Sequence, residues 1–411
     1  MEKRLVSLPK KQTEFMKHHI LKLVLVVCVL TGAGTALAQS VYEPYSFTTL
    51  AGLALNSGTN DDTGSLTRFN QPWGVAADGA GSVYVADTLN QTIRKITPGG
   101  TVTTLAGVAG SPGFADGPAS TAQFSRPTGV AVNGAGTVVY VADFNNHLIR
   151  QISGGVVSTL AGSVSVSGTN DATGTAAQFH NPFGVALNGA GTLVYVADMN
   201  NQTIRAITVP GGAVTTLAGA PTLAGSVDGA NSAARFNTPR GLALDGSGNL
   251  YVADAGNLTV RKILSSGGVS MLAGSVFTPG YTDGLGSVAL FSVLNAMMGP
   301  FGGPCGVAVD TDGNVYVADQ GNHTVRKITP GGSVTTLAGL ALTSGSTDGT
   351  GSLARFNDPA GVAVDGAGKL YVADAANHTI RVGVNANPNP CANLVVNGSF
   401  ETTSPVMSPS T

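Results

Sequence analysis

Residues 370–374 read Leu-Tyr-Val-Ala-Asp, and this short stretch decides how the chain folds. Its core, Tyr-Val-Ala-Asp, occurs six times, with intervals of 56, 55, 56, 65 and 55 residues between successive aspartates. Around each copy the same segments return in the same order: a Gly-Val-Ala run before it, then an Asn-containing loop and a Thr-Ile-Arg-like run. Self-similarity at a fixed period indicates a repeat architecture.

Each period contains β-type runs of about five residues, rich in Val, Ile, Thr and Tyr and separated by Gly, Pro and Asn. Four antiparallel strands joined by tight turns form one blade of a β-propeller. A parallel β-helix is the rival architecture, but its coils would be much shorter than 55 residues. We therefore predict an all-β, six-bladed propeller built from four-stranded antiparallel blades.

The sequence also predicts how the ring of blades closes. The sixth period has three strands, ending near Val382, and lacks the Val-Thr-Thr-Leu-Ala-Gly run that ends the first period at Gly107. A matching run, Ser46–Gly52, stands before the first period. We predict that this N-terminal strand (46–52) completes the last blade and thereby removes the open sheet edges.

The repeat resembles the NHL repeat over about residues 46–384. The resemblance rests on Pro-x-Gly-Val-Ala, on Tyr-Val-Ala-Asp, on Asn377-His-Thr-Ile-Arg381 and on Thr-Thr-Leu-Ala-Gly. It implies a six-bladed propeller. NHL proteins include protein-binding and RNA-binding modules, teneurin-type extracellular propellers and some metal-assisted lyases, so the resemblance alone leaves the function open.

The N-terminus has the three-part layout of a secretory signal peptide. A basic stretch (residues 17–22) precedes an apolar core (residues 23–30), and Ala36-Leu-Ala38 forms a small-x-small cleavage site. Translation could start at Met1 or at Met16, and an uncleaved membrane anchor is the alternative. We expect residues 1–38 to be removed and the protein to be secreted to the extracellular space or the cell envelope.

The character of the chain changes again near its C-terminus. We assign residues 39–384 to the propeller, and residues 385–411 to a linker followed by the truncated start of a second β domain. Residues 393–401 resemble the opening strand of the galactose-binding-like jelly-roll modules of secreted bacterial proteins. Some of these modules bind carbohydrate.

Composition excludes several classes of partner. Charged residues make up only 11% of the chain, and without residues 1–38 it holds 15 basic and 21 acidic residues, a net charge of −6 (15 − 21). Such a surface has no electrostatic footprint for nucleic acid or anionic lipid. We expect a monomer with no nucleic-acid partner, no membrane insertion after signal cleavage, and an extracellular protein or glycan as its ligand.

Residues that recur in every blade are predicted to be structural, because a feature shared by six blades cannot mark one active site. Each Tyr-Val-Ala-Asp aspartate precedes an arginine by seven residues, which allows a bidentate pair across a hairpin. The aspartates are Asp87, Asp143, Asp198, Asp254, Asp319 and Asp374, and the arginines are Arg94, Arg150, Arg205, Arg261, Arg326 and Arg381. A second series of aspartates, beginning with Asp61, stands eight residues before a recurrent phenylalanine.

Few residues remain for catalysis. After residue 38 the chain has two glutamates, both outside the repeats, and three of its four histidines share one repeat position. No spacing suggests a zinc site, so we predict no catalytic residue, no metal and no cofactor. We favour a non-catalytic binding or scaffold module. The alternative is a secreted lyase or hydrolase with a metal in the axial channel.

Specificity is expected where the blades differ, on the face that carries the blade-to-blade links and the loops between second and third strands. We call this the linking face. A long insertion (292–303) precedes the fifth blade. Aromatic, Met and Arg side chains exposed there would suit ligand contact, although some could instead fill the channel. The candidates are Trp73, Phe144, Phe183, His180, Met199, Arg240, Met297, Met298 and Phe301.

Overall fold

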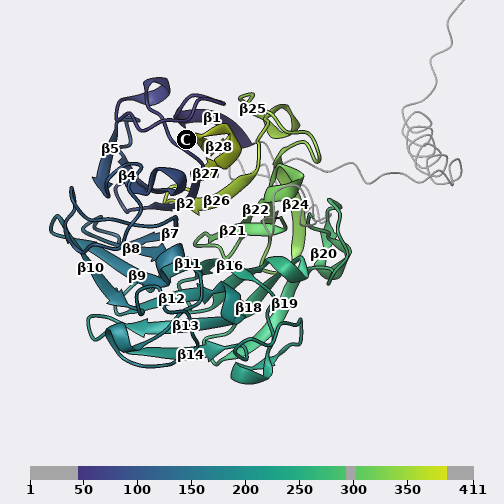
Figure 1. Cartoon of the computed structure of the whole chain (residues 1–411). Helices are drawn as coiled ribbons and strands as arrows, with labels where there is room; N and C mark the ends of the chain where they lie inside the picture. Colours follow the sequence, from purple (N-terminus) through teal and green to yellow (C-terminus); the bar gives the residue numbers. More distant parts are fainter. Residues whose placement is uncertain (1–44, 293–301, 387–411) are drawn as a thin grey trace, which may run out of the picture. The chain divides into compact units, whose positions relative to one another are not determined.

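A computed structural model describes residues 45–292 and 302–386. These residues form six antiparallel sheets arranged around a central axis (Figure 1), which confirms the six-bladed propeller. Within these two ranges, no helix is both long enough and apolar enough to cross a bilayer. The expected signal peptide and the jelly-roll-like segment (393–401) lie outside the described residues.

Each sheet runs from an inner strand at the axis to an outer strand at the rim. The inner strands are β2 (Pro72–Ala77), β7 (Pro127–Val132), β11 (Pro182–Leu187), β16 (Pro239–Leu244), β21 (Pro304–Val309) and β26 (Pro359–Val364). The second strands, which carry Tyr-Val-Ala-Asp, are β3 (Val83–Asp87), β8 (Val138–Asp143), β12 (Leu193–Asp198), β17 (Leu250–Asp254), β22 (Val315–Asp319) and β27 (Leu370–Asp374).

The recurrent arginines lie on the third strands. These strands are β4 (Thr92–Ile96), β9 (Leu148–Ser153), β13 (Thr203–Thr208), β18 (Thr259–Ile263), β23 (Thr324–Ile328) and β28 (Thr379–Asn385). The outer strands are β5 (Val102–Ala106), β10 (Val156–Ala161), β14 (Val214–Ala218), β19 (Gly268–Gly274), β24 (Ser333–Gly339) and β1 (Tyr45–Ala51). Four sheets gain a two-residue fifth strand from the links: β6 (Gly117–Pro118), β15 (Gly229–Ala230), β20 (Gly284–Leu285) and β25 (Gly349–Thr350).

One-turn 3-10 helices connect the second and third strands on the linking face. They span Thr88–Asn90, Phe144–Asn146, Met199–Asn201, Ala255–Asn257, Gln320–Asn322 and Ala375–Asn377. Further 3-10 turns stand on the links, at Gly64–Leu66, Gly174–Ala176, Asn231–Ala233, Gly286–Val288 and Gly351–Leu353.

Ring closure follows the sequence prediction. Strand β1 lies between β28 and β25 in the last sheet, with Tyr45 opposite Asn385 and Ser46 opposite Val384. The first described strand therefore supplies the outer strand of the sixth blade (Figure 1). Its Phe47 is fully buried and meets Phe356 edge-to-face, with ring centroids 5.2 Å apart.

The axis is narrow because the inner strands approach one another backbone to backbone. Each inner strand has a glycine two residues after its first proline, and a Cβ there would collide with a backbone carbonyl of the next blade. Gly74, for example, faces the carbonyl of Thr128, and Gly361 faces that of Trp73. This close approach explains why glycine occupies the same position in all six inner strands.

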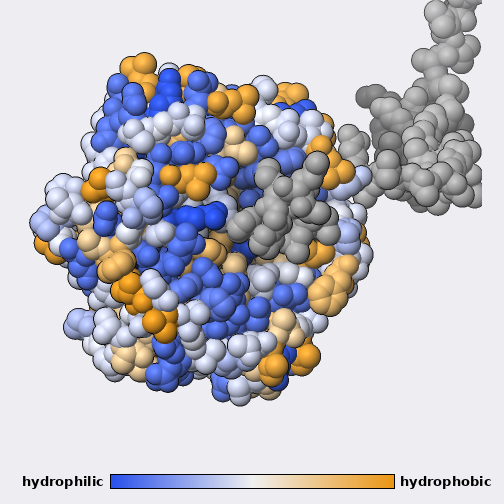
Figure 2. All heavy atoms as spheres, viewed as in Figure 1, coloured by the Kyte–Doolittle hydropathy of each residue, from blue (hydrophilic) through white to orange (hydrophobic). Residues whose placement is uncertain are grey.

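The blades adhere through apolar layers between neighbouring sheets. Tyr84 and Ile93 of the first blade, for example, pack in one cluster with Phe124 and Val139 of the second. On the face seen in Figure 2, apolar side chains are scattered among hydrophilic ones. This distribution is normal for a folded protein in water.

The closing strand should be essential for stability. We predict that Phe47→Ala lowers the free energy of unfolding by about 3–5 kcal/mol, because a fully buried aromatic is removed from the junction that β1 forms with β25 and β28. Thr48→Ala, an exposed position on the same strand, is the control and should change it by about 0.5 kcal/mol or less. Denaturant unfolding measures both. Equal small effects would mean that β1 does not close the ring.

Candidate functional site

A buried arginine holds each blade together. In the first blade, Arg94 Nη1 lies 2.8 Å from Asp87 Oδ2, and its Nη2 lies 2.5 Å from Asp61 Oδ1. Its guanidinium also lies over the Phe69 ring, 5.2 Å from the centroid. Asp61 belongs to the link and Asp87 to the second strand, so one cation connects the link, two strands and the inter-blade layer.

The same arrangement recurs in the other five blades. Strand aspartates lie 2.8–3.1 Å from the arginine, and link aspartates lie 2.5–2.7 Å from it. The link aspartates are Asp116, Asp171, Asp228, Asp283 and Asp348. The expected bidentate pair with one carboxylate is therefore replaced by a fork that reaches two carboxylates, because the link folds back over the third strand.

The strand aspartate is surrounded by donors. Besides Arg94, Asp87 accepts hydrogen bonds from the Asn90 side chain (2.7 Å) and from the Asn70 amide (2.7 Å). Burial raises the pKa of Asp87 to about 6, although Arg94 and these donors act in the opposite direction. Asp87 is therefore a carboxylate at neutral pH, and it fixes the 3-10 turn of the linking face by its hydrogen bond to Asn90.

We call the six arginines and their paired aspartates the Arg–Asp frame. Breaking one of its ion pairs should lower the stability of the protein. Arg205→Met should lower the free energy of unfolding by about 3–5 kcal/mol, because Asp198 would remain buried without its cation. Arg235→Met is the matched control: Arg235 Nη1 contacts only nearby carbonyls in the described structure, those of residues 232–234. Denaturant titration of both variants compares the two costs. If Arg205→Met lowered the free energy of unfolding by less than about 1 kcal/mol, the Arg–Asp pairs would not be a main source of stability.

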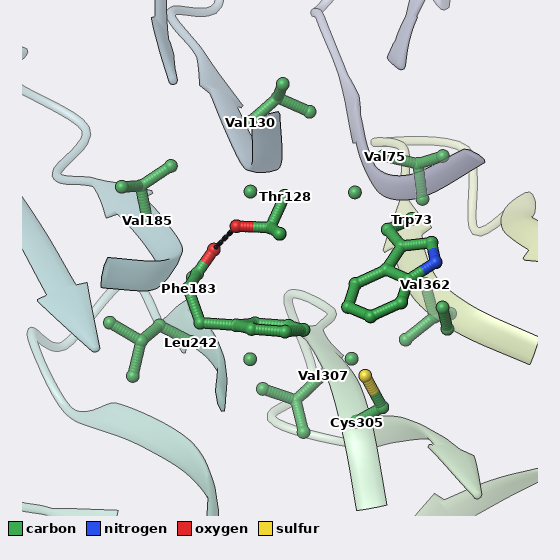
Figure 3. A pocket seen from close by; sticks show the side chains of 17 residues that line it. Trp73, Val75, Thr128, Val130, Phe183, Val185, Leu242, Cys305, Val307 and Val362 are labelled. Carbon is green, nitrogen blue, oxygen red and sulfur yellow. Dashed lines mark hydrogen bonds between the residues drawn. The ribbon is translucent and has the colours of Figure 1, made fainter. Parts of the chain in front are cut away.

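The candidate aromatic residues do not lie exposed on the linking face. Trp73, Phe144, Phe183 and Met199 form one buried cluster, and none is more than 9% exposed. Figure 3 shows Trp73 and Phe183 reaching inward across the ring of inner strands. Their ring centroids are 5.5 Å apart. The expectation of exposed contact residues is wrong for these four, because the axis leaves a gap that large apolar side chains fill.

The remaining candidates occupy different environments. Arg240 is 1% exposed, lies over the Phe183 ring and donates to the Gly302 carbonyl (3.0 Å), so it too is buried rather than exposed. Burial lowers the pKa of Arg240. His180 is half-buried, with its ring 5.7 Å from that of His147. Met297, Met298 and Phe301 lie outside the described residues.

The axial channel is apolar and small. A cavity of about 60 Å³ lies inside the ring of inner strands, next to Trp73 and Phe183. Its described lining contains Cys305 but no histidine or carboxylate, and burial raises the pKa of that thiol. In residues 45–292 and 302–386, no three His, Cys, Asp or Glu side chains are grouped to hold a metal ion. The side chains of the described lining thus offer the Cys305 thiol and the Thr128 hydroxyl, but no imidazole or carboxylate, to the metal of the alternative lyase or hydrolase.

A belt of side-chain hydrogen bonds joins neighbouring blades on the linking face. The residue after each 3-10 turn between second and third strands has a left-handed backbone. In five of the six blades its side chain accepts a hydrogen bond from the backbone N–H of the residue before the next inner-strand proline. Gln91 and Gln202 accept through Oε1 (2.6 Å each), and His147, His323 and His378 accept through Nδ1 (3.0–3.1 Å). At the sixth position Leu258 offers no acceptor, and the junction that it faces is the one with the long insertion.

The histidine bonds require an unprotonated Nδ1. Burial lowers the pKa of His147 and His378, and His180 lowers that of His147 further. Burial also lowers the pKa of His323, although Asp358 and Asp319 act in the opposite direction. Because these values fall below the ordinary value near 6.5, the unfolded chain binds more protons than the folded one near pH 6. The contribution of the belt is therefore complete above about pH 6.5 and is lost as the pH falls.

The glutamines of the same belt provide the test. A variant carrying His147→Gln, His323→Gln and His378→Gln keeps an acceptor at each position but no titrating ring. Between about pH 7.5 and about pH 5.5, we expect the melting temperature of the parent to fall more than that of the variant, by a few degrees. Differential scanning calorimetry at both pH values measures this difference. Identical pH dependence in the two proteins would show that the histidines do not act as neutral acceptors.

A polar hollow lies at one side of the channel mouth. Its volume is about 220 Å³, and its walls are formed by Gln71, Trp73, Arg126, Gln320, Asp358, Ala375 and Ala376. Gln71, Arg126 and Asp358 occupy the same repeat position, the residue before the inner-strand proline, and all three have left-handed backbones. None of these three residues was predicted from the sequence. Their signal was the variation of this position from blade to blade: Gln71, Arg126, Asn181, Thr238, Gly303 and Asp358.

Comparison with known proteins identifies the repeat as the NHL repeat. The NHL repeat profile matches residues 69–96, 124–152, 236–263, 301–328 and 356–382. The chain is 32% identical over 292 residues to Protein SUPPRESSOR OF QUENCHING 1, chloroplastic, of Arabidopsis thaliana, covering 67% of this chain and 26% of that protein. It is 32% identical over 337 residues to NHL repeat-containing protein 2 of Homo sapiens, covering 73% of this chain and 44% of that protein.

More distant similarities point to the same fold. Teneurin-4 of Mus musculus is 27% identical over 277 residues, covering 55% of this chain and 10% of that protein. A solved structure of a protein of unknown function from Bacteroides thetaiotaomicron has a TM-score of 0.63 and 25% identity, covering 84% of this chain and 76% of its own. The chain therefore spans less than half the length of the curated relatives described here.

Proposed function

Because the chain belongs to the NHL-repeat family of β-propellers, we propose that it is a secreted, non-catalytic binding module. Its ligand is an extracellular protein or glycan, and the linking face recognises it. The observation that carries this proposal is the contrast between the frame and the channel mouth. The Arg–Asp frame is the same in six blades, whereas the residue before the inner-strand proline differs in each.

That contrast favours recognition of an asymmetric ligand. Left-handed backbone at the pre-proline position is unusual, because proline disfavours it in the preceding residue. The belt amide bonds hold the backbone in place in five blades regardless of the side chain. The chain can therefore vary this side chain without altering the frame, which is what a binding surface requires.

The closed channel also favours binding at the surface. Trp73, Phe183 and their neighbours fill the axis beneath the mouth, so a ligand on this face meets the loops and the hollow rather than a passage through the ring. Secretion rests on the sequence of residues 1–38, with its basic stretch, apolar core and Ala36-Leu-Ala38 site.

Charge reversal on each face tests the proposal. The full chain is expressed with its own N-terminus, and the protein in the medium, expected to begin at Gln39, is screened against arrays of glycans and surface proteins. Arg126→Glu, on the linking face, should weaken capture at least tenfold, since it reverses a charge in the hollow. Lys369→Glu, exposed in the β26–β27 turn of the opposite face, is the matched control and should bind like the parent.

Two outcomes would contradict the proposal. Loss of capture by Lys369→Glu but not by Arg126→Glu would place the binding surface on the opposite face. A protein that remains inside the cell and still carries residues 1–38 would contradict secretion. Circular dichroism and melting curves of both variants establish that the propeller remains folded.

A further inference from the structure

We propose that three turns on the linking face, over blades four, five and six, dock a protein whose contact surface is apolar at its centre and basic at its edge. The turns begin the links that follow these blades and span residues 53–56, 275–278 and 340–343. We call them the apolar turns. This inference rests on the proposed function, because it uses the same face, and it narrows the ligand from a protein or glycan to a protein.

The third residue of each apolar turn has a backbone conformation that suits glycine or asparagine. Each turn is closed by a hydrogen bond of 3.0 Å from the N–H of its fourth residue to the carbonyl of its first. The third residues are Leu55, Phe277 and Leu342, with φ angles of 63°, 55° and 62°. Left-handed backbone at this turn position favours glycine or asparagine, because most side chains are strained there.

The other three blades show that the turn itself does not need an apolar side chain. At the same left-handed position, the links that follow blades one, two and three have Gly110, Ser165 and Thr222. Glycine adopts this conformation without strain, so the second link has the residue that the turn geometry favours. The leucines and the phenylalanine of the apolar turns therefore require another explanation.

Burial does not provide that explanation. Leu55 is 71% exposed, Phe277 is 64% exposed and Leu342 is 68% exposed. A single exposed leucine is normal on a protein surface. Here exposure coincides with unfavourable backbone in three neighbouring blades, so these residues bring neither burial nor relaxed geometry to the free protein. Strain that does not serve the fold points to a function.

Backbone hydrogen bonds hold the apolar turns on the linking face. The N–H groups of the three left-handed residues donate to the carbonyls of Asn257, Asn322 and Asn377, at 3.1–3.3 Å. Each of these asparagines ends a 3-10 turn and donates through its side chain to the strand aspartate of the Arg–Asp frame. The exposed side chains are thus presented from fixed backbone, which lowers the entropy lost when a partner binds.

The surrounding charges indicate which partner fits. The apolar turns contain no charged residue. Six residues after each left-handed residue stands a link aspartate: Asp61, Asp283 and Asp348 are 44%, 13% and 47% exposed. Each frame has two aspartates for one arginine, a net charge of −1 (1 − 2). Lysine or arginine around an apolar contact would complement these charges, whereas an acidic partner would be repelled.

The side-chain types favour a protein over a glycan. Leu53 and Leu340, the first residues of two apolar turns, are 37% and 38% exposed and enlarge the same aliphatic surface. Leucine side chains have no donor or acceptor for sugar hydroxyls and no flat face for a sugar ring. A contact without charge at its centre and with charge around it is typical of the interface between two proteins.

A matched pair of triple variants tests the docking surface. The first carries Leu55→Asn, Phe277→Asn and Leu342→Asn, since asparagine tolerates the left-handed backbone. The control changes three equally exposed residues of the same links to asparagine: Leu66, Val288 and Leu353, which are 63%, 62% and 69% exposed. Both variants should melt within a few degrees of the parent, because neither loses a buried group.

The control residues lie away from the apolar turns. They end the 3-10 turns of the links, 11 residues after the left-handed residues. Two of these 3-10 turns are bound to hairpins of the opposite face, because Gly64 donates to the Gly100 carbonyl (3.1 Å) and Gly286 to the Gly332 carbonyl (2.9 Å). The two variants therefore remove the same amount of exposed apolar surface at different places.

The secreted full chain is applied to arrays of surface proteins and glycans and to arrays with three sets of synthetic peptides. The first set has leucine and phenylalanine between terminal lysines. The second has glutamates in place of the lysines, and the third has serines in place of the apolar residues. We expect about tenfold more capture by the first set than by the others. The apolar-turn variant should lose about tenfold or more of the parent's protein and peptide capture, and the control variant should bind like the parent.

Several results would overturn this docking surface. They are capture of glycans only, equal capture by the three peptide sets, and unchanged protein capture by the apolar-turn variant. Binding to phosphatidylcholine vesicles that the apolar-turn variant loses would assign the turns to a membrane instead. Self-association of the parent in sedimentation velocity, lost in the same variant, would assign them to a second copy of the chain.

The proposed function can be judged separately. It would still hold if the parent captured a glycan or protein that Arg126→Glu weakened and the apolar-turn variant did not. Loss of capture by Lys369→Glu alone would overturn the proposed function and this inference together.

Discussion

The structure depends on one interaction repeated six times, a buried arginine whose two terminal nitrogens reach two aspartates. Arg94, for example, joins Asp87 of the second strand to Asp61 of the link and lies against Phe69 between the blades. Leaving the arginine or the strand aspartate, each at most 1% exposed, without its partner inside the protein would be costly. The link, the strand pair and the inter-blade layer must therefore form together, and the 3-10 turn is fixed because Asn90 binds the same carboxylate.

The residues that stabilise the blades are different from the residues that vary between blades. The strand order places the 3-10 turns and the links on one face, and the belt bonds hold the pre-proline backbone from blade to blade. Side chains at that position can then change without cost to the frame. The result is a channel mouth with two unlike halves: an apolar half closed by Phe144 and Met199, and a polar half with the hollow beside Ala375 and Ala376.

Most of the fold could be predicted from the sequence, and the reason is physical. The short β-type runs, the repeat of about 55 residues and the early run at Ser46–Gly52 each reflect strand pairing within a blade or a contact that recurs in every blade. The pairing of strand aspartates with arginines could also be predicted, since residues seven apart across this hairpin are diagonal neighbours: Asp87 lies opposite Thr92, two residues before Arg94. The second aspartate of each fork was harder to predict, because the link returns to the third strand only in the folded blade.

The site was much less predictable. Trp73 and Phe183 have the residue types of a binding surface, and a sequence does not show that six inner strands leave an axial gap that needs filling. The residues of the hollow gave a weaker signal, a position that varies beside a constant proline. Only the arrangement of blades six, one and two brings Asp358, Gln71 and Arg126 to one side of the mouth.

The central claim is that ligands bind to the variable linking face of an invariant frame. Hydrogen–deuterium exchange of the secreted chain, with and without its captured ligand, tests this claim most directly. We expect slower exchange in the pre-proline segments and 3-10 turns around residues 70–72, 125–127, 357–359 and 375–378. Exchange in the opposite-face turns around residues 245–249 and 310–314 should be unchanged. Protection confined to those opposite-face turns would contradict the central claim.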